Sequence, residues 1–211
     1  MGADSSVVLG IMGDLGQTSD SSVTLQHIQG DVDVRMTLLI GDLSYADSGW
    51  QPTPGSPCTQ ARWDTWGELV EPLFSTQPGM FLPGNHEVEA DDQDAAFLAF
   101  QSRFRMPAAA SQATHGNLYY SFHVASAHII MLNSYMNFTA GSDQYRWLAA
   151  DLAHVDRTVT PWLIVCLHAP WCVAYASPHA RRVSQHALGR LNLTTSYERC
   201  AERFWVGARC E

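Results

Sequence analysis

Polar side chains suited to metal binding follow four separate apolar segments of the chain. They occur in the motifs GDLG, GDLSY, GNHE and VCLH, and the residues concerned are Asp14, Asp42, Tyr45, Asn85, His86 and His168. Carboxylate, phenol, amide and imidazole groups together suit a pair of hard or borderline metal ions. Such metal pairs are typical of enzymes that hydrolyse phosphate esters. The pattern therefore predicts metal-dependent phosphoester hydrolysis.

Asp42 is the side chain best suited to link two metal ions. Its carboxylate has two oxygens, and two-metal hydrolases hold their cations about 3.5–4 Å apart. Asp14 would then bind one ion, while Asn85 and His168 would offer an amide oxygen and an imidazole nitrogen to the other. Bound cations lower the pKa of coordinated water. We expect His86 to protonate the leaving alkoxide or to donate a hydrogen bond to a phosphate oxygen.

Each motif must be positioned by the element that precedes it. The apolar segments 7–11, 37–40, 80–82 and 162–167 have the character of buried strands. An open sheet places the carboxyl ends of its strands along one edge, where ligand sites form. The polar residues that follow these strands are therefore expected to converge.

Helices and a strand pair are predicted between these strands. Helical spacing of apolar residues predicts a helix over 21–29 that begins with a serine cap, a helix over 59–74 whose last turn Pro72 breaks, and a helix over 95–104. Segment 119–134 predicts two antiparallel strands, with the turn at 125–127. Ser142 is expected to cap a helix that carries Tyr145, Leu148, Leu152 and Val155 on one face.

Several other residues are expected to be structural. Cys166 lies inside an apolar strand and is predicted to be buried, and Trp63 and Trp66 are predicted to pack a helix against a sheet. Core or edge positions are predicted for His115, His123 and His128. A solvated loop is predicted for the acidic cluster Glu87, Glu89, Asp91, Asp92 and Asp94.

Composition limits the classes of function. The chain has 211 residues, of which 46% are hydrophobic and 16% charged, so it is expected to fold. Its net charge of −9 argues against a nucleic-acid or anionic-membrane surface, which needs clustered Lys and Arg. No apolar segment reaches the length of a membrane-spanning helix. The N-terminal residues lack the features of a signal peptide.

The order of GDLG, GDLSYAD, GNHE and VxxH resembles that of the calcineurin-like metallophosphoesterases. Tyr45, three residues after Asp42, narrows the resemblance to the purple acid phosphatases. The segments RWDTWGELVEPL, GNHEVE and HAPW are similar to the plant-type branch, and the resemblance covers roughly residues 7–172. It implies a four-layer α/β/β/α sandwich in which 1–175 form a partial catalytic domain and 176–211 form a divergent tail.

The resemblance also implies a ligand set and a mixed metal pair. Asp14 and Tyr45 would bind a ferric ion, Asn85 and His168 would bind divalent zinc, manganese or iron, and Asp42 would bridge the two ions. The function implied is an acid phosphatase that acts on small phosphorylated substrates, with no nucleic-acid or membrane partner; a homodimer is left open. Family members are typically secreted or vacuolar, and the compartment of this chain is left unassigned.

Two histidines are implied to contact the substrate. His86 matches a substrate-contacting histidine of the family, and His179 lies near the spacing of a second one. For His179 a surface position beside Arg181 and Arg182 is an equal alternative.

One family motif is missing from the sequence. The final GHxH motif, which supplies an imidazole to each metal, does not occur after His168. The N-terminal β-sandwich of the plant-type enzymes is also missing, so a chain truncated at both ends, or the product of a mis-spliced gene, is expected. Three functions stay open: an acid phosphatase, an inactive or metal-poor fragment of one, and a divalent-metal phosphodiesterase. Tyr45 argues against the last.

Overall fold

The computed structural model describes residues 6–47, 59–89 and 96–169. The chain divides into two compact units, one formed by residues 6–106 and the other containing residues 107–169. Each unit is considered by itself. The predicted tail 176–211 and His179 lie outside the described residues.

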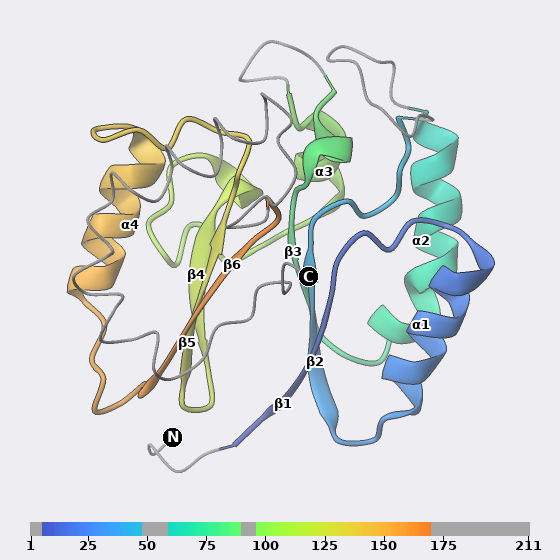
Figure 1. Ribbon diagram of the computed structural model, residues 1–211, viewed down its shortest axis with the longest axis horizontal. Helices are drawn as coiled ribbons and strands as arrows, with labels where there is room; N and C mark the ends of the chain where they lie inside the picture. Colours follow the sequence, from blue (N-terminus) through green and yellow to red (C-terminus); the bar gives the residue numbers. More distant parts are fainter. Residues whose placement is uncertain (1–5, 48–58, 90–95, 170–211) are drawn as a thin grey trace, which may run out of the picture. The chain divides into compact units, whose positions relative to one another are not determined.

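A parallel sheet organises the unit 6–106. Its strands are β1 (Val8–Met12), β2 (Val34–Ile40) and β3 (Gly79–Leu82), in the order β1-β2-β3. Helices α1 (Ser19–Gly30) and α2 (Gln60–Phe74) lie together on one side of this sheet (Figure 1). The short helices η1 (Asn85–Glu87) and α3 (Leu98–Arg103) follow β3.

The core of this unit lies between the central strand and α2. Leu38 and Leu39 of β2 are fully buried. In α2 the buried residues Trp63, Trp66, Val70 and Leu73 recur at helical spacing, so they form one apolar face. Both tryptophan rings lie 6.2 Å from the ring of Phe104. The Trp66 ring also lies 6.5 Å from that of Phe81 in β3, so the predicted packing of the helix against the sheet is confirmed for Trp66.

One detail is wrong in each of the helices predicted over 21–29 and 59–74. The N-cap of α1 is Thr18, not a serine: its Oγ1 accepts from the N–H of Ser21, while Ser21 Oγ accepts from the N–H of Thr18. This reciprocal pair is a capping box, and it places the helix start two residues before Ser21. Pro72 does not break α2, which continues to Phe74. Since Pro72 sits in the last turn, it removes one N–H donor there while Ser75 N still bonds to Glu71 O.

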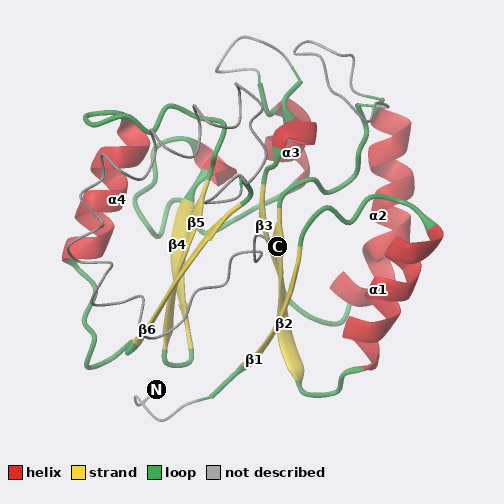
Figure 2. Ribbon diagram, in the orientation of Figure 1, coloured by secondary structure: helices red, strands yellow, loops and turns green. Residues whose placement is uncertain are grey.

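The described part of the second unit holds a mixed sheet. Strand β4 (Tyr120–Val124) runs antiparallel to β5 (Ala127–Leu132), and β6 (Trp162–Leu167) runs parallel to β5, as Figure 2 shows in yellow. All six residues of the central strand β5 are buried. The predicted strand pair, and the predicted strand over 162–167, are confirmed. A short helix η2 (Gly116–Leu118) precedes β4.

Helix α4 (Asp143–Ala153) begins after the predicted cap Ser142, whose Oγ accepts from Tyr145 N. Its buried face differs from the prediction, because of the four expected residues only Leu148 is buried. Gln144 and Trp147 occupy the rest of that face. They are held by polar contacts: Gln144 bonds to the N–H and C=O of Asn133, and Trp147 Nε1 donates to Ser111 O. Hydrogen bonding has thus overridden the simple apolar pattern.

His128 and Cys166 have the core positions that the sequence predicted, and His123 lies in an edge strand, whereas His115 has neither kind of position. His128 is buried in β5, and its Nε2 lies 2.7 Å from Asp151 Oδ2. His115 lies outside the strands and bonds to Asp143, while His123 lies in β4. Cys166 is buried in β6, and burial raises the pKa of its thiol to about 12. Among the described residues, no helix has the length and apolar character needed to cross a membrane. The mixed α/β class is confirmed, since each unit contributes one sheet with helices.

Candidate metal centre

The motif residues of the unit 6–106 lie just beyond the carboxyl ends of its strands. Asp14 follows the end of β1 by two residues, Asp42 follows the end of β2 by two, and Asn85 follows the end of β3 by three. Because β1, β2 and β3 are parallel, these three positions share one edge of the sheet. The loops are also bonded to one another, since Asp14 N donates to Gly41 O at 3.0 Å. Within this unit the predicted convergence is confirmed.

Three of the predicted ligands have an unusual backbone. Asp14, Asp42 and Tyr45 have φ angles of 53°, 52° and 50°. This left-handed region costs a non-glycine residue roughly 1–2 kcal/mol. Such strain persists where the surrounding structure enforces it, and it clusters at functional sites. The folding of these loops therefore fixes the directions of all three side chains at an energetic cost.

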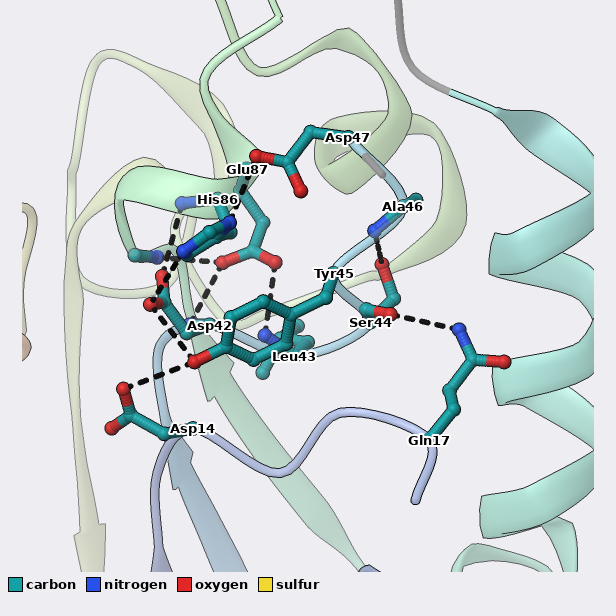
Figure 3. Close-up of polar contacts among 11 residues, drawn as sticks. Asp14, Gln17, Asp42, Leu43, Ser44, Tyr45, Ala46, Asp47, His86 and Glu87 are labelled. Carbon is teal, nitrogen blue, oxygen red and sulfur yellow. Dashed lines mark hydrogen bonds and ion pairs between the residues drawn. The ribbon is translucent and has the colours of Figure 1, made fainter. Parts of the chain in front are cut away.

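The side chains of these residues form a set of oxygen donors. The Tyr45 hydroxyl lies 3.2 Å from Asp14 Oδ1 and 3.4 Å from Asp42 Oδ2, as the dashed lines in Figure 3 show. Burial, followed by the nearby charges of Asp42 and Asp14, raises the pKa of the Tyr45 phenol. A cation among these oxygens acts in the opposite direction, because it stabilises the phenolate. Two carboxylates and a phenol are a donor set that fits a hard metal ion.

The His86 imidazole lies between the carboxylates of Asp42 and Asp47. Its Nδ1 is 2.8 Å from Asp47 Oδ2, and its Nε2 is 3.7 Å from Asp42 Oδ2. The imidazole also packs on the Tyr45 ring, with 4.1 Å between ring centroids (Figure 3). Asp47 was not among the site residues predicted from the sequence. The feature of the sequence that could have identified Asp47 is its place as the last residue of GDLSYAD, two residues after Tyr45.

Glu87 corrects the prediction of a solvated acidic loop. Its side chain is buried, with 1% of the residue exposed, and its oxygens accept backbone N–H groups from two loops. Glu89 is half-buried and accepts from Ala99 N at 2.8 Å. The other members of the predicted acidic loop, Asp91, Asp92 and Asp94, lie outside the described residues. Burial with matched donors explains the difference, because hydrogen bonds make a buried carboxylate tolerable.

The other two predicted ligands also follow strands. Asn85 is half-buried and begins η1 directly after the Pro-Gly pair that follows β3. His168 follows β6 in the second unit, where its ring centroid lies 6.0 Å from that of Tyr135. The next residue is fixed there by a bond from Ala169 N to Ser134 Oγ. Each of these two ligands thus has the local position that the sequence predicted.

Comparisons with known proteins agree with this geometry. Residues 8–193 match the family described as "Calcineurin-like phosphoesterase". Purple acid phosphatase 22 of Arabidopsis thaliana is 48% identical over 167 residues, which are 78% of this chain and 36% of that protein. Purple acid phosphatase 1 of Ipomoea batatas is 38% identical over 191 residues, 89% of this chain and 39% of its own length. The chain therefore spans somewhat over a third of the length of these relatives.

A solved structure has the same fold. The purple acid phosphatase PPD1 from seeds of yellow lupin, Lupinus luteus, superposes with a TM-score of 0.68 at 23% sequence identity. The superposition covers 90% of this chain and 36% of the lupin chain. The predicted metallophosphoesterase fold is confirmed, and so is the resemblance to plant purple acid phosphatases. By its sequence match and its fold, the chain belongs to the calcineurin-like phosphoesterase family.

Proposed function

We propose that this chain hydrolyses small phosphomonoesters at a dinuclear metal centre. Membership of the family implies phosphoester hydrolysis with two metals, and the relatives compared above are named acid phosphatases. The observation that carries the proposal is the convergence of three oxygen ligands: the Tyr45 hydroxyl lies within 3.4 Å of a carboxylate oxygen of Asp14 and of Asp42. A phenol beside two carboxylates is a donor set that suits a hard metal ion.

The residues divide into two sets of ligands. Asp14 and Tyr45 would hold a ferric ion, Asn85 and His168 a divalent zinc, manganese or iron ion, and Asp42 would be shared. Two cations bound there would lower the pKa of a coordinated water and neutralise the oxygens of a phosphate group. The carboxylates and the phenol supply negative charge that favours a trivalent ion at the Asp14 and Tyr45 side. The amide and the imidazole suit a divalent ion.

We assign to His86 the role of assisting the departure of the leaving group. Asp47 accepts a hydrogen bond from Nδ1, which directs Nε2 toward the Asp42 side of the site. From there Nε2 can donate a hydrogen bond to a phosphate oxygen or pass a proton to the departing alkoxide. The Tyr45 ring supports one face of the imidazole and limits its rotation. Asp47 and Tyr45 thus orient the ring, and His86 would contact the substrate.

Small substrates fit the charge of the chain better than polyanions. The net charge is −9, and an extended phosphate backbone needs clustered cationic residues for binding. A single phosphate group requires only the metal pair and one or two donors. A compact phosphomonoester is therefore the proposed substrate class.

The test compares two chromogenic esters on the purified chain. After loading with ferric and zinc ions, p-nitrophenyl phosphate should be hydrolysed faster than bis(p-nitrophenyl) phosphate. Asp42→Asn should reduce this turnover more than about 100-fold, since loss of an outer partner alone typically costs 10–100-fold. Asp33→Asn is the matched control, because Asp33 is exposed and precedes β2 at the other end of that strand.

Three results would contradict the proposal. Faster cleavage of the diester would identify a phosphodiesterase. Absence of turnover in a folded, metal-loaded chain would identify an inactive fragment. Equal activity of Asp42→Asn and the parent chain would show that hydrolysis occurs elsewhere.

A further inference from the structure

Glu87 is a buried acidic side chain with no role in the proposed chemistry. Only 1% of the residue is exposed, and it ends the short helix η1 in the motif GNHE. Burying a carboxylate is costly unless hydrogen-bond donors replace the lost water. Its partners therefore indicate what the residue does.

Three backbone N–H groups donate to this carboxylate. Oε2 accepts from Asp42 N at 2.9 Å and from Gly84 N at 2.8 Å, and Oε1 accepts from Leu43 N at 2.9 Å. Two of the donors belong to the loop after β2 and one to the loop after β3. Both oxygens of Glu87 are thus committed to the protein backbone, and they join two loops about 45 residues apart in sequence.

The loops that follow β2 and β3 also contact each other through a further hydrogen bond and through a close approach of their backbones. His86 N donates to Asp42 Oδ1 at 3.0 Å. A Cβ atom on Gly84 would lie 2.1 Å from Asp42 Oδ1 and 2.4 Å from Asp42 N, so only glycine permits this approach. The GNHE loop therefore holds Asp42 by two hydrogen bonds. Asp42 N donates to the Glu87 carboxylate, and His86 N donates to the Asp42 carboxylate.

Asp42 needs such support because of its conformation. It has a φ of 52° and follows Gly41, whose φ is 92°. A non-glycine residue in the left-handed region is disfavoured, so other interactions must hold it there. Hydrogen bonds to a charged acceptor are stronger than neutral ones. The two bonds from Asp42 N and Leu43 N to one carboxylate supply that support at the strained position.

We propose that Glu87 is a positioning residue of the metal centre. Its carboxylate locks the loop that carries Asp42 to the loop that carries Asn85 and His86, so that these side chains keep a fixed relative geometry before any metal binds. The part concerning metals rests on the proposed function. The locking itself is a property of the metal-free chain.

Glu87→Gln is the informative variant. Glutamine has the same length, but one of its two terminal atoms is an NH₂ group, which cannot accept the N–H groups that now face it. Glu89→Gln is the matched control, because Glu89 is two residues away and its Oε2 accepts from Ala99 N. Both substitutions remove one negative charge from the same segment.

The first measurement is amide hydrogen exchange in the metal-free full chain. In Glu87→Gln, protection in the peptides 41–45 and 83–88 should fall together by about tenfold or more, as expected when bonds to a charged group are lost. Protection of α2 should not change. Glu89→Gln should leave both peptides protected as in the parent chain.

The second measurement is Mn²⁺ binding, followed by the electron paramagnetic resonance signal of free Mn²⁺ at a temperature where all variants are folded. Glu87→Gln should raise the Mn²⁺ dissociation constant by about 10–100-fold. Glu89→Gln should bind Mn²⁺ with the affinity of the parent chain.

The outcomes separate this proposal from the proposed function. If the two peptides do not lose protection together, or if α2 loses as much, Glu87 does not lock the loops and the proposal is overturned. Loss of protection with unchanged Mn²⁺ affinity also overturns it, because the locking would not matter for the site. If the parent chain binds neither Mn²⁺ nor Zn²⁺, the proposed function fails, and the exchange data alone decide whether Glu87 holds the loops.

Discussion

His86 Nδ1 lies 2.8 Å from Asp47 Oδ2, and both side chains are buried, with 7% and 4% of their surfaces exposed. Because a carboxylate can only accept, the imidazole donates its Nδ1–H, and this bond fixes the orientation of the ring. Among the described residues Asp47 Oδ1 has no hydrogen-bond partner, so the described polar contact of Asp47 is the one with His86. The pair forms a unit in which Asp47 orients the histidine that is proposed to contact substrate.

Asp47→Asn should impair turnover without weakening substrate binding in proportion. The amide is a poorer acceptor, so the ring loses its fixed orientation, and kcat should fall by about 10–100-fold with a small change in KM. Steady-state kinetics with p-nitrophenyl phosphate measure both constants. Asp64→Asn, at an exposed aspartate of α2 that pairs with Arg103, serves as the control.

If Asp47 acts through His86, the two substitutions are not additive. The double variant Asp47→Asn, His86→Ala should be no slower than His86→Ala alone. Fully multiplicative losses would show that Asp47 acts on something other than this ring.

Gly84→Ala tests the close contact of the two loops. The added methyl would meet Asp42 Oδ1 at 2.1 Å and backbone at 2.4 Å, so the loops must separate, and the free energy of unfolding should fall by about 1–3 kcal/mol. Gly67→Ala is the control: it lies in α2 with no atom within 4 Å of the added Cβ, and it should stabilise the chain by roughly 0.5–1 kcal/mol. Urea unfolding measures the change in the free energy of unfolding for both variants. Equal effects of the two variants would contradict the contact.

Asp151 should make the second unit sensitive to acid. Burial opposes its ionisation, but hydrogen bonds from His128 and Ser121 outweigh burial and lower the pKa of this carboxyl below its ordinary value. A lowered folded-state pKa contributes stability above the unfolded-state pKa, near 4, and this contribution is lost as pH falls through the folded-state pKa.

Asp151→Asn should therefore destabilise the chain by about 1–3 kcal/mol at pH 7, and by less as the pH falls below about 4. Thermal unfolding at a series of pH values measures this difference, with Asp33→Asn as an exposed control. A difference that grows toward acid pH would contradict the assignment.

Cys166 should be chemically silent in the folded chain. Burial in β6 raises the pKa of its thiol to about 12, so almost none of it is thiolate at pH 8. Iodoacetamide followed by peptide mass spectrometry should find Cys166 unlabelled in the native chain and labelled in concentrated urea. Labelling of Cys166 under native conditions would show that β6 opens readily.

The sequence predicted those features that depend on local pattern. The strand over 162–167 was predicted without error, and β1, β2 and β3 end within one residue of their predicted ends, because apolar segments bounded by Gly and Asp have few other interpretations. The convergence of Asp14, Asp42 and Tyr45 was predicted for the same reason, since each follows a strand end in a short motif, and their side chains do lie together.

The sequence did not reveal features that depend on long-range hydrogen bonds. Glu87 begins an acidic run in the sequence, yet its burial follows from donors such as Asp42 N and Leu43 N, some 45 residues away. Asp47 was passed over because its partner His86 lies on a different loop. On α4, the contact of Gln144 with Asn133 placed a polar residue on the buried face. Sequence periodicity carries no information about such partners.

The most direct test of the metal centre is the visible absorption spectrum of the chain after loading with ferric and zinc ions. Because the Tyr45 hydroxyl lies beside the carboxylates of Asp14 and Asp42, we expect a visible band from a tyrosine phenolate bound to ferric iron, at one ferric and one zinc ion per chain. Tyr45→Phe should abolish the band. A band that persists in Tyr45→Phe, or a folded chain that retains no iron, would contradict the assignment of these oxygens as metal ligands.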